Sequence, residues 1–106
     1  MRVIITDFAK NQIRETAKYI QKEFGKISKD NFMKNVQLTR KLIGTNPYLG
    51  ILEPLLENEP GNNRSIVVNS FNKLIYHIVD DHIEVSAFWD MRREPDSLIG
   101  QIISEQ

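Results

Sequence analysis

The sequence of 106 residues contains no cysteine and only two histidines, His77 and His82. Without cysteine, the chain can form neither a disulfide nor a thiolate metal site. Two imidazoles are too few for an ordinary structural zinc site. We therefore expect no metal and no cofactor.

Long hydrophobic runs are missing too. No stretch approaches the roughly 20 apolar residues that cross a bilayer. The apolar run that follows Met1 and Arg2 is too short for the core of a signal peptide. The sequence therefore predicts a cytoplasmic protein that does not contact a membrane.

An excess of charge of one sign is also absent, because 14 Lys and Arg balance 14 Asp and Glu. Residues 1–63 contain ten basic and seven acidic residues, whereas residues 64–106 contain four and seven, a net charge of −3. Proteins that bind nucleic acids usually gather Lys and Arg on the contact face, because neutralising phosphates supplies much of the affinity. The sequence does not show such a face, so we expect no direct sequence-specific nucleic-acid binding by this chain alone.

The first 24 residues predict a short strand followed by a helix. The run from Val3 to Ile5 is β-branched, as in strands. Thr6 or Asp7 can accept hydrogen bonds from the free amides of the first helical turn, and Gly25 suits a C-terminal cap. Apolar residues recur at helical spacing between these ends: Ala9, Ile13, Ala17 (or Thr16), Ile20 and Phe24.

A second helix is predicted to start at Ser28 or Asp30 and to end at Gly44. Its apolar stripe comprises Phe32, Val36, Thr39 and Ile43, widened by Leu38 and Leu42. The connection between the two helices is short, so the helices should pack as an antiparallel hairpin.

Residues 45–63 are rich in turn formers and predict an irregular connection, which we expect to be held to the core by Ile51, Leu52, Leu55 and Leu56. Residues 65–71, 74–79 and 82–89 then predict a meander, with a tight turn at Asp80 and Asp81. Strand alternation should place Leu74, Tyr76 and Ile78 on one face, and Ile75, His77 and Val79 on the other. Ile83, Val85 and Ala87 should likewise share a face.

Pro95 can start a short tail helix whose apolar face is Leu98, Ile99, Ile102 and Ile103. The predicted fold is one α+β domain over residues 1–106: an N-terminal strand, an antiparallel two-helix hairpin, a three-stranded antiparallel meander and a short C-terminal helix. The helices should cover one side of the sheet and leave its other face partly free.

Three stretches of sequence resemble the RelE/ParE toxin superfamily in their order and spacing. The first contains Asn46-Pro47-Tyr48-Leu49-Gly50 with Glu53-Pro54-Leu55, and the second is Arg64-Ser65-Ile66-Val67-Val68. The third begins with Lys73-Leu74-Ile75-Tyr76-His77-Ile78-Val79-Asp80-Asp81-His82-Ile83 and runs into Phe88-Trp89-Asp90-Met91-Arg92-Arg93-Glu94-Pro95. The last four residues resemble the ParE branch more than the RelE branch.

The resemblance implies the toxin half of a type II toxin–antitoxin module, of the kind that stabilises plasmids, with a cognate antitoxin protein as partner. The antitoxin would lay a helix, and often a strand, across the toxin. RelE-type toxins are ribosome-dependent endoribonucleases that cut mRNA, whereas ParE-type toxins inhibit DNA gyrase and need no catalytic groups. A relative that has lost toxicity and only binds a protein is a third possible function. The chain could also form a homodimer.

If the nuclease interpretation holds, the resemblance offers Arg64, Arg92, Arg93 and Glu53 as catalytic residues, because RNA cleavage needs acid–base groups and cations for the phosphoryl group. Structural alternatives exist for these residues. Arg64 could pair with Glu53 or Glu57, and the two C-terminal arginines could be solvated charges at a strand end.

If the chain instead acts by binding, Arg92 and Arg93 are candidates for target or antitoxin contact, together with Trp89 and Phe88. These two aromatic residues point in opposite directions along a strand, so one is expected to be core and the other an exposed patch. A mid-strand His77, an exposed His82 and a hairpin-turn Lys73 are expected to be structural. The acidic C-terminal part favours the ParE-like gyrase inhibitor, which is not an enzyme, over the nuclease that docks on the ribosome and its mRNA.

Overall fold

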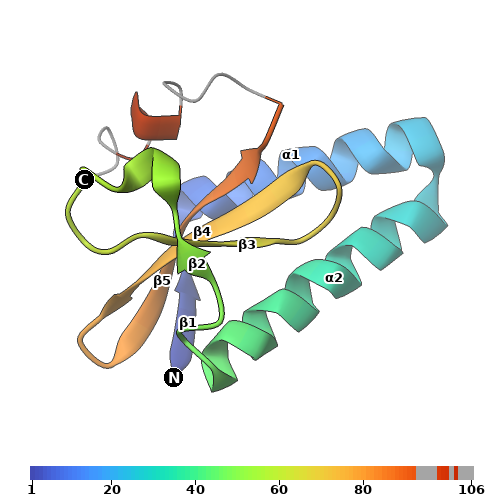
Figure 1. Ribbon diagram of the computed structural model, residues 1–106. Coiled ribbons are helices and arrows are strands. Elements are labelled where there is room, and N and C mark those ends of the chain that lie inside the picture. Colours follow the sequence, from blue (N-terminus) through green and yellow to red (C-terminus); the bar gives the residue numbers. More distant parts are fainter. Residues whose placement is uncertain (93–97, 101, 103–106) are drawn as a thin grey trace.

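The computed structural model describes residues 1–92, 98–100 and 102. Two helices and a five-stranded sheet form the body of the molecule, and the helical residues 98–100 follow (Figure 1). The elements are β1 (Arg2–Ile5), α1 (Asp7–Phe24), α2 (Lys26–Thr45), β2 (Ile51–Leu52), the 3-10 helix η1 (Pro54–Leu56), β3 (Arg64–Val67), β4 (Asn72–Val79) and β5 (His82–Asp90).

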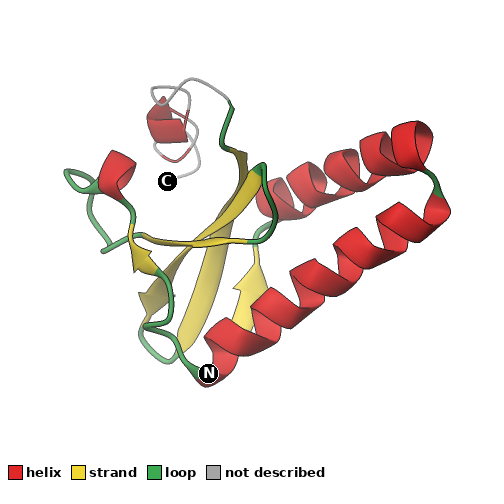
Figure 2. Ribbon diagram, turned by 45° about the vertical axis from the view of Figure 1, so that its right-hand side comes forward, coloured by secondary structure: helices red, strands yellow, loops and turns green. Residues whose placement is uncertain are grey.

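The strand order in the sheet is β1-β5-β4-β3-β2. The meander β3–β4–β5 is antiparallel, as predicted, and β2 adds to it antiparallel to β3. β1 pairs with β5 in parallel, a pairing that the sequence analysis did not predict. The α1–α2 hairpin lies beside the sheet, and the corner between its two helices extends away from the strands (Figures 1 and 2).

Both helices form where predicted, although the second is longer than expected. Thr6 caps α1 by accepting a hydrogen bond from the backbone N–H of Ala9 at 3.1 Å. α2 begins at Lys26, directly after Gly25, rather than at Ser28 or Asp30, because Gly25 has a φ of 93° and turns the chain at once. It continues through Gly44 to Thr45, so the expected end at Gly44 was wrong.

The main core lies between the hairpin and one face of the sheet. The expected residues of α2 are buried: Phe32, Val36, Thr39 and Ile43. They meet a sheet face that contains Leu74, Tyr76, Ile83 and Val85. Phe24, predicted to belong to the apolar stripe of α1, is 67% exposed at the hairpin corner. Leu38 and Leu42, predicted to widen the stripe of α2, are also exposed, so both predictions were wrong.

The opposite face of the sheet is covered at one end and otherwise left free by the helices, in agreement with the expectation of a partly free face. A second apolar cluster there contains Leu56, Ile75, Ala87, Trp89, Leu98 and Ile102. η1 and residues 98 and 102 of the tail supply the cover for the strands. Pro95 and Ile103 lie outside the described residues.

Ala87 was predicted to share a face with Ile83 and Val85. It belongs instead to this second cluster, so that prediction was wrong. The reason is a register shift: Ile75 pairs with Ala87, whereas Tyr76 pairs with Val85, so Ser86 is an extra residue in β5. A bulge of this kind reverses the alternation of the residues that follow.

The connection between α2 and β3 contains two regular elements, β2 and η1, that the sequence analysis did not predict because the segment is rich in turn-forming residues. Leu56 is buried, but Ile51 and Leu52 are exposed at the sheet edge and do not hold the loop to the core as expected. Within the described residues, no helix is long and apolar enough to cross a membrane.

Candidate functional site

Arg64 begins β3, as predicted, and is held by the loop that follows α2. Its Nη1 donates to the carbonyl oxygen of Gly50 at 2.8 Å, and its guanidinium lies 4.9 Å from the centre of the Tyr48 ring. The expected pairing with Glu53 or Glu57 is not formed, because a backbone carbonyl and an aromatic face take the guanidinium instead.

Tyr76 holds the same loop, between α2 and β2, through its hydroxyl group. Its hydroxyl accepts from the N–H of Gly50 at 2.9 Å and donates to the carbonyl of Pro47 at 2.8 Å. A side chain at Gly50 would lie 2.7 Å from this hydroxyl, so only glycine allows the approach. Burial raises the pKa of Tyr76 above 10.0, although the Gly50 hydrogen bond and the charge of Arg64 oppose the shift.

Glu53 is held in a buried ion pair with Lys73. The carboxylate is 2% exposed and the lysine side chain 14%, and 2.7 Å separates Glu53 Oε1 from Lys73 Nζ. Burial raises the pKa of Glu53, but hydrogen bonds from Lys73 and Ser65, the charge of Lys73 and the backbone N–H of Leu55 outweigh it and lower the pKa below 4.5. Lys73 is therefore not the hairpin-turn charge that the sequence suggested.

The sheet separates Arg64 from this ion pair. Arg64 is paired directly with Tyr76 in the ladder, and directly opposed residues extend to the same face. Lys73, three positions before Tyr76, extends to the other face. The structure therefore does not combine Arg64 and Glu53 into one acid–base site.

Arg92 lies just beyond β5, near the start of β4, whereas Arg64 lies at the level of Tyr76 in the middle of β4. Its guanidinium donates to both carboxylate oxygens of Asp90, at 3.0 and 2.8 Å, and its carbon lies 4.4 Å from the centre of the Phe71 ring. These hydrogen bonds and the charge of Asp90 raise the pKa of Arg92 above its ordinary value. Arg64 pairs with Tyr76 and Asp90 pairs with Asn72, so four residue steps along β4, about 13 Å, separate the levels of the two arginines. Arg93 lies outside the described residues.

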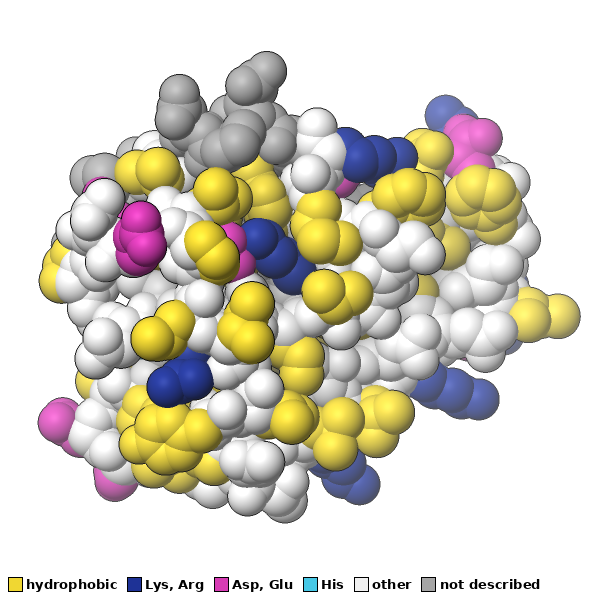
Figure 3. All heavy atoms as spheres, viewed as in Figure 1, with side chains coloured by type: hydrophobic (Ala, Val, Ile, Leu, Met, Phe, Trp, Pro, Cys, Tyr) yellow, Lys and Arg dark blue, Asp and Glu magenta, His cyan; other side chains and the backbone are white. Residues whose placement is uncertain are grey.

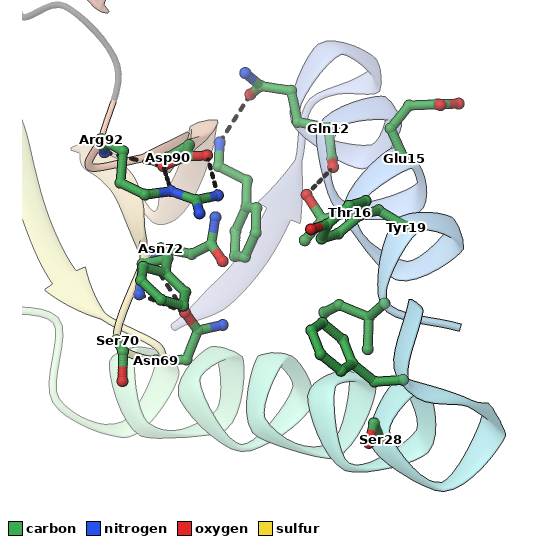
Figure 4. Close-up of a pocket in the computed structure, with 14 residues that line it drawn as sticks. Gln12, Glu15, Thr16, Tyr19, Ser28, Asn69, Ser70, Asn72, Asp90 and Arg92 are labelled. Carbon is green, nitrogen blue, oxygen red and sulfur yellow. Dashed lines mark hydrogen bonds and ion pairs between the residues drawn. The ribbon is translucent and has the colours of Figure 1, made fainter. Parts of the chain in front are cut away.

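Arg92 stands at the rim of a groove of about 860 Å³ between α1 and the β3–β4 turn. Figure 4 shows Gln12, Thr16 and Tyr19 on the α1 wall, and Asn69, Asn72, Asp90 and Arg92 across from them. Gln12 accepts a hydrogen bond from the N–H of Phe88 at 2.8 Å, which joins α1 to β5 beyond the end of β1. The groove is mostly apolar at its α1–α2 end, where Tyr19, Ile20 and Phe24 line it.

Trp89 and Phe88 are both buried, at 1% and 3% exposure. They do point in opposite directions, but each direction leads into a core cluster, Trp89 with Leu56 and Phe88 with Phe32. The expectation that one of them forms an exposed patch for a partner was therefore wrong, because the tail and η1 cover the second face.

The two histidines lie on the β4–β5 hairpin. His77 Nε2 lies 3.9 Å from Glu84 Oε1, and alternation directs His77 to the face opposite Tyr76 and Arg64. His82 Nδ1 lies 3.5 Å from Asp81 Oδ1 beside the turn, and its side chain is only 20% exposed, so the expectation of an exposed His82 was wrong. In residues 1–92, 98–100 and 102, no three His, Asp or Glu side chains are grouped as a metal ion would require.

The sequence analysis missed Tyr48, Lys73, Phe71 and Asp90 as partners of the charged candidates. For Lys73 a signal was available, since it shares strand parity with Ile75 and so must extend to the face that Ile75 helps to build. For the other three no local signal exists, because their contacts join separate elements.

Comparison with known proteins identifies the fold. No protein-family model matches the sequence, and no curated protein matches it. A solved structure does match, that of a YoeB dimer from Staphylococcus aureus, with 24% sequence identity and a TM-score of 0.55. The alignment covers 82% of this chain and 92% of the other. The fold is therefore that of a RelE/YoeB-like α+β protein, as the sequence analysis predicted.

Proposed function

We propose that this protein is the toxin component of a type II toxin–antitoxin module and that it acts by binding its target, without cleaving RNA. Support for the toxin class comes from the fold shared with YoeB over 82% of this chain and 92% of the other. The three stretches that resemble the RelE/ParE superfamily also contribute observed elements: η1, β3 and the β4–β5 hairpin.

The Glu53–Lys73 ion pair is the observation that carries the second half of the proposal. A general base or acid must reach the proton that it transfers, at hydrogen-bonding distance in the substrate complex. Glu53 is buried, bonded to Lys73 and ionised through its lowered pKa, so it can neither reach an RNA ribose nor donate a proton near neutral pH. Arg64 stands on the other side of the sheet from it.

DNA gyrase is the target we propose, on the resemblance of Arg92-Arg93-Glu94-Pro95 to the ParE branch. The distribution of charge supports a protein target over an RNA-lined one. Figure 3 shows the Lys and Arg side chains of the sheet side as separate spots with hydrophobic and uncharged atoms between them, not as one basic surface.

A ribosome-dependent nuclease of the RelE type is the second candidate. It is favoured by the likeness to YoeB, and by Arg64, which opens β3 where such toxins carry a catalytic arginine. The neighbour was solved as a dimer, so self-association of this chain is a further part of the proposal, which light scattering of the purified protein can test.

Induced expression in a bacterial host, with and without the adjacent gene, tests the toxin class. Growth should stop without the antitoxin and resume with it, and harmless expression alone would favour a non-toxic binding relative.

Purified chain should block supercoiling by gyrase, and Arg64→Ala should block it as well as the wild type does. Lys41→Ala, an exposed substitution on α2, is the matched control. A supercoiling reaction that proceeds at its normal rate would refute the gyrase target.

A further inference from the structure

The two outer edges of the sheet differ in how they are covered. At the β1 edge, the Arg40 guanidinium donates to the carbonyl oxygen of Val3 at 2.8 Å. The terminal amine of Met1 donates to the carbonyl oxygen of Gly44, at the end of α2, at 2.6 Å. A charged side chain and a helix therefore protect this edge, which are two devices that keep a further strand from pairing. The other edge is formed by β2 and the end of β3.

The backbone N–H and C=O of Leu52 point outward at this second edge. The next residue, Glu53, donates its N–H to the carbonyl oxygen of Asn63 at 2.8 Å, so its backbone groups point toward the β3 side. Hydrogen-bonded and non-hydrogen-bonded pairs alternate along an antiparallel ladder, so Leu52 and Arg64 form a non-hydrogen-bonded pair. Because β2 is the last strand in the sheet order, no described strand accepts or donates to the outward groups of Leu52.

Large apolar side chains flank the same edge. Residues 46–52 contain no charged residue. Figure 3, viewed as Figure 1, shows hydrophobic side chains gathered where β2 and β3 lie in front of the rest of the sheet. The exposed ones on β2, on β3 and in the loop before β2 are Tyr48, Leu49, Ile51, Leu52 and Val67.

The area of this apolar edge, defined as these five residues, matches what a stable dimer requires. A fully exposed large apolar side chain presents about 100–150 Å², so five that are about half exposed present roughly 400 Å². A standard interface buries about 800 Å² on each partner, of which about 57% is apolar. The apolar edge therefore provides nearly all the apolar share of such an interface.

We propose that two copies of this chain associate through the apolar edge, with Leu52 of one copy directly opposite Leu52 of the other on a two-fold axis. Two opposed residues of a hydrogen-bonded antiparallel pair exchange both of their N–H and C=O bonds, so each Leu52 satisfies the other. The same neutral segment on both sides brings no like charges together. A charged partner segment, in contrast, would find no counter-charge within residues 46–52.

This inference names the surface of the self-association proposed above and rests on that part of the proposed function, but not on the gyrase target. Sedimentation equilibrium of the full chain should show a dimer for the wild type. Leu52→Lys should raise the Kd of the dimer about 100-fold or more, because both copies lose an apolar contact and two like charges meet on the axis. Leu52→Glu should have the same effect.

Mixing the two variants tests the two-fold pairing itself. Leu52→Lys and Leu52→Glu together place opposite charges across the axis, so a heterodimer should form although neither variant dimerises alone. Native mass spectrometry detects it when one variant carries a heavy-isotope label. Leu38→Lys and Leu38→Glu are the matched controls, because Leu38 on α2 is 56% exposed, as is Leu52. Each control should dimerise like the wild type, without preference for the other in the mixture.

Amide hydrogen exchange gives a readout that does not depend on the substitutions. The N–H of Leu52 should be protected above the Kd of the wild-type dimer and should exchange freely on dilution. A dimer that Leu52→Lys does not weaken, or a Leu52 amide that exchanges equally fast in dimer and monomer, would overturn the edge pairing alone. A wild type that stays monomeric would overturn the self-association as well, whereas the toxin class is tested separately by growth arrest.

Discussion

Replacing Lys73 with methionine would leave the Glu53 carboxylate buried without the cation that now lies 2.7 Å from it. Removal of one partner from a buried ion pair destabilises proteins by about 3–5 kcal/mol, because a charge remains out of water without compensation. Glu53 keeps its hydrogen bonds from Ser65 and from the backbone of Leu55. We therefore expect a loss near the lower end, about 3 kcal/mol in the free energy of unfolding, or roughly 10–20 °C in Tm.

The pH dependence of this loss follows from the lowered pKa of Glu53. A carboxyl whose pKa is lower in the folded than in the unfolded chain stabilises the fold above the unfolded value, here 4.5, and ceases to do so as pH falls through the folded pKa. Lys73→Met removes the cation that lowers the pKa and leaves the burial that raises it. The difference in stability between wild type and variant should thus be greatest near pH 7 and shrink below about pH 4.5.

Urea unfolding followed by circular dichroism at pH 7 and pH 4 measures both effects. The double variant Glu53→Gln with Lys73→Met removes both charges and should recover part of the loss. Lys41→Met, at an exposed position, should change stability by less than about 0.5 kcal/mol. If Lys73→Met is as stable as the wild type at pH 7, the carboxylate is not buried as described and the argument against Glu53 as a catalytic group is lost.

Three further substitutions test the placement of the loop, the tail and the hairpin corner by urea unfolding. Gly50→Ala should cost about 1–3 kcal/mol, because the added Cβ would lie 2.7 Å from the hydroxyl of Tyr76; a neutral effect would contradict the described loop. Trp89→Ala should cost about 3–5 kcal/mol, and loss of partner binding with full stability would show instead that Trp89 is on the surface. Gly25→Ala has open space around it, but a φ of 93° with a ψ of 175° is essentially restricted to glycine. We therefore expect a loss of about 1–3 kcal/mol from backbone strain alone, and no loss would mean that α1 and α2 meet differently.

The helices and the meander could be predicted from sequence because their signals are local. The caps at Thr6 and Gly25 and the apolar spacing of α2 depend only on residues a few positions away. The Asp80-Asp81 turn joins two consecutive strands. The parallel pairing of β1 with β5 joins residues about 80 positions apart, and the pattern of a four-residue strand does not select its neighbour. The bulge at Ser86 has no residue signature either, and it reversed the predicted direction of Ala87.

The positions of the charged candidates were predictable, but their partners were not. Arg64 opens β3 as expected, because the β-branched run that follows it favours a strand. Its partners, Gly50 and Tyr48, reach it through a loop whose path is set by Tyr76. Glu53 and Lys73 are 20 residues apart, and their ion pair, on which the proposed mode of action rests, exists only once η1 packs on the sheet.

Primer extension on a defined mRNA, held on ribosomes with an empty A site and incubated with purified chain, tests most directly whether the proposed toxin works without RNA cleavage. We predict only full-length extension products, at a concentration of purified chain that matches the level at which expression in cells arrests growth. New stops at the A-site codon, abolished by Arg64→Ala but retained in Lys41→Ala, would contradict this prediction and establish the nuclease instead.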